Sequence, residues 1–356
     1  MNMFSLFNLA RPAIFALDPE KGHRLAIAAL KRMPANSTFM PQAKPGPLAV
    51  EVAGLTFPNP VGVAAGFDKD AEVPDALLGL GFGFTEVGSL TPLPQAGNPK
   101  PRLFRLVEDK AVINRMGFNN SGAEVALKRL KQREGRGGIV GINIGANKDS
   151  DDRSADYATM TRIMAPLASY LAINVSSPNT PGLRALQDEA ALAALIDGIM
   201  AASQEAVGEG GPPVFLKVAP DLEPADIDAI ARIAIDKKLG ALIVSNTTIS
   251  RPPLRSRHAD ETGGLSGAPL RDLAQQRLRD FRKATGGQVP LVGVGGIATA
   301  EHAWDRIRAG ASLVQLYSAM VYHGPGLGAQ IAGGLKRLMK RDGFGSIAEA
   351  VGTDSD

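Results

Sequence analysis

The sequence predicts an α/β protein built as a (β/α)8 TIM barrel with an N-terminal amphipathic helical extension. From residue 59 onward, eight short apolar segments alternate with eight segments of helical periodicity. Polar side chains gather where the apolar segments end, as they do in barrel enzymes. The glycine-rich segment 293–296 follows the seventh apolar segment. An open dinucleotide-binding sheet, the runner-up fold, would carry its glycine fingerprint after the first strand.

Residues 1–40 form the predicted extension. An apolar stretch over residues 3–17 precedes Asp18-Pro19-Glu20, which is typical of a helix N-cap followed by proline at the first helical position. The next segment mixes apolar residues with lysine and arginine, so the sequence predicts a pair of amphipathic helices with a basic face. Such a pair can lie in a membrane interface. A helical hairpin docked on the main body is the alternative.

Residues 41–341 form the predicted barrel domain, and residues 342–356 a short tail that we expect to fray. A linker is predicted over 41–47 and a small hairpin over 48–57. The predicted strands are 61–65, 82–87, 139–144, 171–175, 214–218, 241–245, 291–294 and 313–316. The predicted helices lie near 71–79, 121–133, 155–167, 187–206, 224–237, 270–283, 299–308 and 327–340. The connections 88–120 and 247–269 are long, which favours a functional role, and the second is a candidate lid.

Composition excludes several classes of function. The 356 residues include no cysteine and four histidines, which excludes a thiolate nucleophile and disfavours a metal site. A net charge of +3 is too small to indicate nucleic-acid binding. The N-terminus makes a poor signal peptide, and no run of about 18 apolar residues predicts a helix that crosses a bilayer. The expectation from these features alone is a cytoplasmic protein.

The segment Ile173-Asn174-Val175-Ser176-Ser177-Pro178-Asn179-Thr180 concentrates polar groups at the end of one predicted strand. Its uncharged amides and hydroxyls suit the orientation of a planar polar ligand and supply at most a weak base. The alternative is an ordinary polar turn after a strand.

Other predicted strands also end in polar residues or glycine, and buried strand ends rarely hold so many amides, hydroxyls and lysines without a ligand. The glycines after strand seven and Tyr317-Ser318 after strand eight stand where such barrels usually bind phosphate. Lys217 is a snorkelling lysine, a cation beside an electron-rich ring, or a Schiff-base amine. These residues predict a phosphate-bearing cofactor or substrate without selecting a reaction.

Five motifs, in order along nearly the whole chain, resemble the dihydroorotate dehydrogenase family, and more narrowly its class 2, quinone-linked form. They are Ala65-Gly66-Phe67-Asp68-Lys69, Asn114-Arg115-Met116-Gly117-Phe118, Asn174-Val175-Ser176-Ser177-Pro178-Asn179-Thr180, Ser245-Asn246-Thr247-Thr248 and Gly263-Gly264-Leu265-Ser266-Gly267. The resemblance implies an FMN enzyme of pyrimidine (UMP) biosynthesis that oxidises (S)-dihydroorotate to orotate and reduces a membrane quinone.

The resemblance also assigns roles to residues, with Ser177 as the base that takes the C5 proton. FMN would be held by Ala65, Gly66, Phe67, Asp68, Lys69, Ser89, Asn143, Asn174, Lys217, Ser245, Gly267, Gly296, Tyr317 and Ser318. Orotate would be held by Lys69, Asn114, Arg115, Met116, Gly117, Phe118, Asn174, Asn179, Asn246 and Thr247. The quinone tunnel would be lined by His23, Arg102 and Tyr317.

The absence of cysteine separates the two classes of the family, because the soluble class 1 enzymes use a cysteine base. Ser89 and Ser245 stand where the family often has threonine, and the retained hydroxyls keep the expectation of FMN binding. The resemblance further implies a peripheral membrane protein on the cytoplasmic face of a bacterial inner membrane. It implies neither a nucleic-acid partner nor an obligatory protein partner.

Two other classes of function remain open at this level. One is a Schiff-base aldolase on the same barrel, with Lys217 as its nucleophile. The other is a membrane-peripheral binding module that holds no cofactor. Bound flavin absorbs visible light, so an absorbance spectrum separates both from a flavoenzyme.

Overall fold

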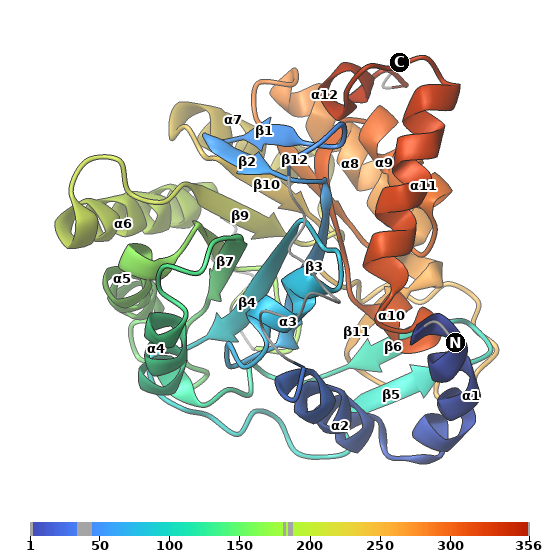
Figure 1. The fold of residues 1–356 in the computed structure, drawn as a ribbon. Helices are drawn as coiled ribbons and strands as arrows, with labels where there is room; N and C mark the ends of the chain where they lie inside the picture. Colours follow the sequence, from blue (N-terminus) through green and yellow to red (C-terminus); the bar gives the residue numbers. More distant parts are fainter. Residues whose placement is uncertain (1–2, 34–44, 181–182, 184–187, 355–356) are drawn as a thin grey trace.

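Eight parallel strands close into a barrel at the centre of the molecule (Figure 1). The computed structural model describes residues 3–33, 45–180, 183 and 188–354. The strands follow one another round the barrel in chain order, and the last pairs with the first. They are β3 (Val61–Asp68), β4 (Phe84–Leu90), β7 (Ile139–Ile144), β8 (Tyr170–Asn174), β9 (Val214–Val218), β10 (Ala241–Val244), β12 (Leu291–Val294) and β13 (Ala311–Leu316). The predicted barrel and all eight of its predicted strands are confirmed.

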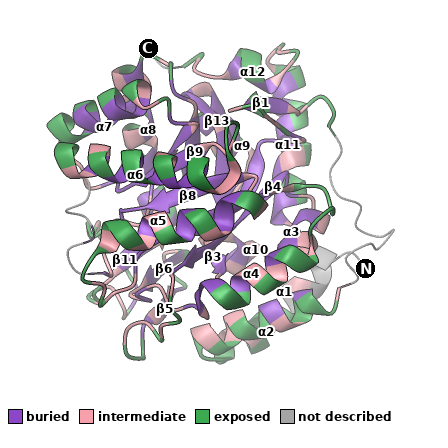
Figure 2. Ribbon diagram, turned by 90° about the vertical axis from the view of Figure 1, so that its left-hand side faces the viewer, coloured by how far each residue is buried: buried purple, intermediate pink, exposed green. Residues whose placement is uncertain are grey.

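Helices surround the barrel with their buried faces inward and their exposed faces outward (Figure 2). Each predicted helix is present within a few residues of its predicted bounds. They are α3 (Pro74–Gly79), α4 (Gly122–Gln132), α5 (Arg153–Met164), α6 (Glu189–Val207), α7 (Pro224–Asp236), α8 (Arg271–Thr285), α9 (Ala300–Arg308) and α11 (Leu327–Arg341). The structure adds α10 (Ser318–His323) and the 3₁₀ turns Ala165–Leu167 and Ala268–Leu270.

One of these helices, α6, is long and apolar enough to cross a membrane by length and composition alone. The sequence does not predict such a helix, because polar and charged residues interrupt the apolar residues of α6. Leu192, Leu195 and Ile196 are buried in the hydrophobic core, as expected for a helix that covers a barrel. Its Asp197 pairs with Lys237 of the neighbouring loop at 2.6 Å. These contacts make α6 an outer helix of the barrel.

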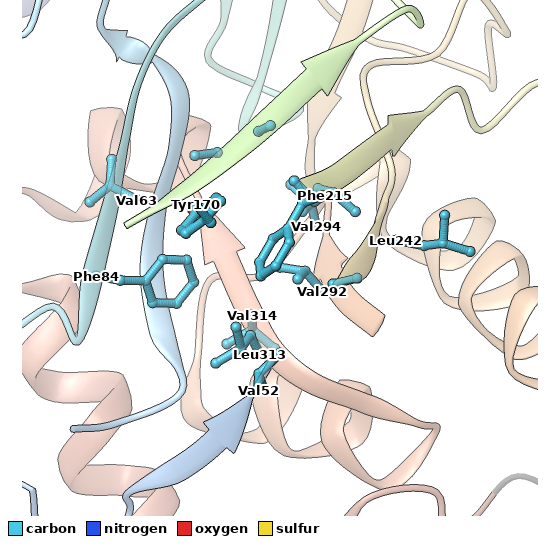
Figure 3. Close-up of a cluster of buried hydrophobic side chains, with 14 of the residues drawn as sticks. Val52, Val63, Phe84, Tyr170, Phe215, Leu242, Val292, Val294, Leu313 and Val314 are labelled. Carbon is cyan, nitrogen blue, oxygen red and sulfur yellow. The ribbon is translucent and has the colours of Figure 1, made fainter. Parts of the chain in front are cut away.

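Three aromatic rings fill the barrel interior (Figure 3). The rings of Tyr170 and Phe215 stack with their centroids 4.3 Å apart, and Phe84 meets Tyr170 edge-on at 6.4 Å. Gly62 and Gly141 are the strand neighbours of Phe84 and Tyr170. A Cβ on Gly141 would lie 2.0 Å from the Tyr170 ring. Glycine is required there because a close-packed interior has room for only the larger partner of each pair.

The predicted hairpin closes the N-terminal end of the barrel (Figure 1). It consists of β1 (Val50–Val52) and β2 (Leu55–Phe57), joined by Ala53 and Gly54 with positive φ angles of 51° and 78°. Such angles are typical of the tight turns that match strand twist. Val52 and Phe57 are buried and join the main core, so the hairpin seals the end of the barrel away from the polar strand tips.

A three-stranded antiparallel sheet lies at the other end of the barrel, where the sequence predicted only loops. It comprises β5 (Leu103–Leu106), β6 (Ala111–Asn114) and β11 (Gly264–Gly267). Phe104, Leu106, Ile113 and Leu265 form a small apolar core of their own on this sheet. The strands are only four residues long, and β11 begins and ends with glycine, which weakens its propensity for strand. The two long connections are therefore tied together rather than free.

The N-terminal helix pair packs beside this small sheet (Figure 1). Helix α1 spans Met3–Ala16 and α2 spans Pro19–Lys31. The predicted cap is confirmed, because the Asp18 side chain accepts from the backbone N–H groups of Glu20 and Lys21 at 3.1 and 3.0 Å. The predicted linker 41–47 lies largely outside the described residues.

The C-terminal tail corrects one expectation. Instead of fraying, the chain after α11 forms a short helix, α12 (Ile347–Ala350), whose end residues are both buried. The backbone N–H of Asp354 then donates to the carbonyl of Arg308 at 2.8 Å. The prediction was wrong because it gave too little weight to the short apolar piece of this segment, whose Ile347 and Ala350 are buried in the core.

Candidate active site

A cavity of about 1030 Å³ opens at the C-terminal ends of the barrel strands and continues to the N-terminal helix pair. Amides, hydroxyls and lysines line its barrel end, while residues of α1 and α2 such as Ile14, Phe15, Ala26 and Leu30 line the other. Cavities of this size hold ligands the size of cofactors. One continuous space thus joins the polar strand tips to an apolar mouth.

Most of the predicted site residues meet in this cavity. From the predicted FMN set these are Ala65, Gly66, Phe67, Lys69, Ser89, Asn174, Lys217, Ser245, Gly267, Gly296, Tyr317 and Ser318. From the predicted orotate set they are Lys69, Asn114, Met116, Gly117, Phe118, Asn174, Asn179, Asn246 and Thr247. Ser177 and His23 line it as well. Seven of the eight barrel strand ends, all but that of β7, and the small sheet bring these positions together from across the chain.

Ser177 lies in the loop after β8, buried and facing the cavity. Its Oγ accepts from the backbone N–H of Asn179 at 3.3 Å. The Asn179 side chain donates to Asn114 Oδ1 at 3.3 Å, which ties this loop to the end of β6. A hydroxyl and two amides therefore face one side of the cavity, an arrangement that can orient a planar ligand with amide edges.

Two lysines supply positive charge to the cavity. Lys217 is buried on β9, and burial lowers the pKa of its ammonium group, against the opposing effect of the Glu86 charge. Its ammonium group forms no hydrogen bond or ion pair with the described residues, although Lys217 lines the cavity. Burial lowers the pKa of Lys69 to about 8, so this lysine is still mainly cationic at neutral pH. A buried ammonium group without a hydrogen-bonded protein partner requires a ligand acceptor or a bound water.

Three glycines with positive φ angles form a backbone cradle at the far side of the cavity. They are Gly267, Gly295 and Gly296, with φ angles of 95°, 112° and 72°. A Cβ on Gly296 would lie 2.4 Å from the Cβ of Arg271, so only glycine fits. Ser318, beside them, shares a hydrogen bond with Ser266 at 2.7 Å between the two hydroxyls. Close backbone approach of this kind suits an anionic phosphate group.

An aromatic cluster stands between the polar end and the apolar end. The rings of His23 and Tyr317 meet the Phe67 ring edge-on, at centroid distances of 5.3 and 5.7 Å. Burial, followed by the charges of Lys69 and Arg24, lowers the pKa of His23 to about 4. His23 is therefore a neutral ring at physiological pH, which suits a position facing an apolar ligand.

Four predicted site residues do not line the cavity. Asp68 instead accepts from the backbone N–H groups of Glu72 and Val73, at 2.7 and 2.8 Å, before α3. Asn143 lies one layer deeper in the barrel. Arg115 points away and pairs with Glu261 at 2.7 Å. Arg102 binds Glu20 of α2 at 2.7 Å, outside the predicted tunnel.

The structure also finds residues that sequence reasoning missed. Arg105, on β5, lines the cavity where Arg102 was expected, and it donates to the carbonyl of Ile14 at 3.2 Å. Arg102 precedes β5 and is held by Glu20, whereas Arg105 lies within the strand and reaches the cavity. Glu86 and Gln315 lie fully buried in strands β4 and β13. A charged residue within the apolar run before Val87 was the available signal for Glu86.

Comparisons with known proteins agree on one family. The model of the family described as dihydroorotate dehydrogenase matches residues 47–339. A dihydroorotate dehydrogenase (quinone) from Erythrobacter litoralis is 72% identical, covering 98% of this chain and all of the relative. The protein of the same name from Novosphingobium aromaticivorans is 66% identical over 98% of this chain and 99% of its own. The crystal structure of DHODH in complex with ferulenol from Eimeria tenella matches with a TM-score of 0.88, 40% identity, and 95% and 96% of the two chains.

Proposed function

This chain belongs to the dihydroorotate dehydrogenase family, and from that premise we propose how its barrel oxidises dihydroorotate to orotate and passes the electrons to a quinone. It is an oxidoreductase of pyrimidine biosynthesis in the quinone-linked class. The observation that carries the proposal is the single cavity that joins the polar strand tips to the apolar helix pair. A polar substrate and an apolar quinone can thus reach the same cavity from its two ends.

FMN is the proposed cofactor, and the residues present fit it. The glycine cradle of Gly267, Gly295 and Gly296 suits its phosphate, and the buried ammonium of Lys217 suits a ring system that gains negative charge. The neighbouring hydroxyls and amides of Ser89, Asn174, Ser245 and Ser318 would complete the site. When bound, FMN would supply an acceptor for the hydride from C6 of dihydroorotate and a carrier of its electrons to quinone.

Ser177 is the proposed base. Its Oγ takes the proton from C5, the hydrogen on C6 leaves with its electron pair, and the C5–C6 double bond of orotate forms. A hydroxyl is a poor base at neutral pH, so the reaction depends on positioning more than on basicity. Burial of Ser177 keeps bulk water away, and the N–H of Asn179 holds the Oγ in place.

Substrate is held by amides and one cation in this proposal. Lys69 carries a positive charge at neutral pH and can meet the orotate carboxylate. Asn114, Asn179 and Asn246 face the same volume and can pair with the amide edges of the ring. Thr247 is the further proposed contact, next to Asn246 at the end of β10.

The helix pair is the proposed entrance for quinone and the proposed membrane-docking segment, residues 1–40. Leu17 and Leu25 are exposed on it, beside lysines and arginines. His23 and Tyr317 would line the quinone path, with Arg105 in the place first given to Arg102. We place the protein on the cytoplasmic face of a bacterial inner membrane, bound to lipid and without an obligatory protein partner. Residues 41–341 form the proposed catalytic domain and 342–356 its tail.

The experiment is a Ser177→Ala variant, compared with wild type by absorbance and by rapid mixing with dihydroorotate. We expect both proteins to be yellow, and the variant to lose nearly all flavin reduction because the C5 proton has no acceptor. A matched control is Ser203→Ala, a buried serine on α6 outside the cavity. If the flavin of the Ser177→Ala variant is reduced by dihydroorotate at the wild-type rate, Ser177 is not the base. A colourless wild-type protein would favour the aldolase or the binding module instead.

A further inference from the structure

A buried carboxylate lies beneath the cavity without any part in the chemistry described so far. Glu86 is fully buried in β4. Its oxygens accept from Asn143 Nδ2 at 2.8 Å, from the Tyr170 hydroxyl at 3.0 Å and from Gln315 Nε2 at 2.7 Å. Burial of an ionised carboxyl costs several kcal/mol even after relaxation. Its place at the centre of a barrel therefore calls for a functional account.

A line of hydrogen bonds runs from the cavity to Glu86 and points one way throughout. Asn246 Nδ2 donates to Asn174 Oδ1 at 3.3 Å, and Asn174 Nδ2 donates to Ser89 Oγ at 3.0 Å. Ser89 Oγ donates to Asn143 Oδ1, and Asn143 donates to Glu86. We call Asn246, Asn174, Ser89 and Asn143 the hydrogen-bond chain.

The direction of the hydrogen-bond chain follows from its last acceptor. A carboxylate has no proton to give, so Asn143 must turn its NH₂ group toward Glu86 and its oxygen toward Ser89. That oxygen accepts the hydrogen bond of the Ser89 hydroxyl, so the Ser89 oxygen in turn accepts from Asn174. Asn174 then accepts from Asn246 through its own oxygen. Three members of the chain line the cavity, so the charge of Glu86 decides which of their atoms are donors there.

Glu86 also balances Lys217. Burial lowers the pKa of Lys217, and the charge of Glu86 is the one electrostatic effect described that raises it. No ion pair joins the two side chains in the part of the chain that is described, so the ammonium group stays available to a ligand. Burial and then the Glu86 charge raise the pKa of Tyr170 well above its usual value, so its hydroxyl remains a donor to Glu86.

We propose that Glu86 is a positioning residue for the oxidation reaction: its negative charge sets the direction of the hydrogen-bond chain and offsets the positive charge of Lys217. Cofactor and substrate would meet the outer members of the chain and Lys217, and never Glu86 itself. The inference rests on the proposed function, because it concerns how the same site is prepared for its ligands.

The test is Glu86→Gln, in which a carboxamide of equal size replaces the carboxylate. The NH₂ group of this carboxamide cannot accept the hydrogen bonds that the replaced carboxylate oxygen accepted from Asn143, or from Tyr170 and Gln315. The substitution also removes the negative charge. We measure the release of FMN from the holoenzyme on dilution, by flavin fluorescence, from neutral to alkaline pH. We expect about tenfold weaker FMN binding or more. The pH at which binding declines through deprotonation of Lys217 should fall by about one unit or more.

Matched variants separate this role from general destabilisation. Lys217→Met should abolish the alkaline decline, and Glu205→Gln, an exposed carboxyl on α6, should leave both readouts at wild-type values. Glu86→Asp keeps the charge but withdraws it by one methylene, so it should fall between wild type and Glu86→Gln. If Glu86→Gln does not fold, the FMN affinity and the alkaline decline of Glu86→Asp test the proposal instead.

The outcomes distinguish the two levels of the argument. Wild-type affinity and a wild-type alkaline decline in Glu86→Gln, or in Glu86→Asp where that variant decides, would overturn the role of Glu86 alone. A wild-type protein that binds no flavin and oxidises no dihydroorotate would overturn the proposed function, and the role of Glu86 with it. Weaker binding with an unmoved alkaline decline would also count against the proposal, because a purely structural role predicts that result.

Discussion

At the scale of single residues, this site is marked by buried cations that pair with no carboxylate among the described residues. Arg306 is fully buried on α9, and its guanidinium donates to the carbonyls of Gly295 and Arg271 at 2.8 and 2.9 Å. Burial, followed by the Arg271 charge, lowers the pKa of Arg306 to about 9, so it is still charged at neutral pH. The charge lies directly behind the glycine cradle, where the FMN phosphate is proposed to bind.

Arg306→Met should therefore weaken binding of FMN by about tenfold or more and weaken binding of riboflavin much less, because only FMN carries the phosphate. Fluorescence titration with both flavins measures the ratio. Arg308→Met on the same helix, whose guanidinium pairs with Asp354, is the control and should keep the wild-type ratio. Equal losses for both flavins would mean that Arg306 only shapes the glycine cradle.

At the scale of elements, α2 is held to the barrel by groups that acidification disturbs. Hydrogen bonding to Arg102 lowers the pKa of Glu20. Burial lowers the pKa of His23 from 6.5 to about 4. An undocked His23 takes up a proton near pH 6.5, whereas a docked His23 does so only near pH 4. Protonation therefore favours the undocked state, and docking weakens as pH falls from about 6.5 to about 4. The contribution of Glu20 is present above its ordinary pKa of 4.5 and is lost as pH falls below it.

We expect α2 to loosen between pH 6.5 and 4. The chain has no cysteine, so Lys21→Cys, on the exposed side of α2, accepts a single fluorescent label. Its anisotropy should fall across this pH range. In a His23→Phe background the fall should begin only near the lower pH at which Glu20 is protonated. An unchanged onset would show that His23 does not control docking.

Removal of residues 1–40 should separate the two halves of the reaction. The strand tips remain, so reduction of the flavin by dihydroorotate should be retained, while quinone turnover should fall severely because the apolar mouth of the cavity is lost. Stopped-flow reduction and steady-state quinone assays measure the two halves, and retained flavin absorbance reports that the barrel is folded. Wild-type quinone turnover would contradict the proposed role of the helix pair.

At the scale of the whole molecule, the barrel interior and the site share a residue. The Tyr170 ring packs on Phe215 while its hydroxyl donates to Glu86, so the packing of the apolar layer fixes the polar layer above it. Gly141 is the strand neighbour that leaves room for the ring.

Gly141→Ala should lower the free energy of unfolding by about 1–3 kcal/mol, because its Cβ would overlap the Tyr170 ring. Gly198→Ala is the matched control, since Gly198 lies on the exposed face of α6 with nothing near its Cβ position. That variant should gain up to about 1 kcal/mol from better helix propensity. Urea denaturation of both measures the difference, and equal stabilities would contradict the packing argument.

The sequence by itself determined the eight barrel strands and the helices around them through local hydrophobic periodicity, and the start of α2 through its cap Asp18. It also located the polar strand-end residues of the cavity, because strand ends in a barrel converge wherever they occur in the chain. Only the tertiary structure decided that Arg105 rather than Arg102 faces the cavity, since Arg102 is drawn away by Glu20, which is distant in sequence. It alone showed the small sheet and the directional chain ending at Glu86, because these are contacts between residues far apart in sequence, which local pattern does not encode.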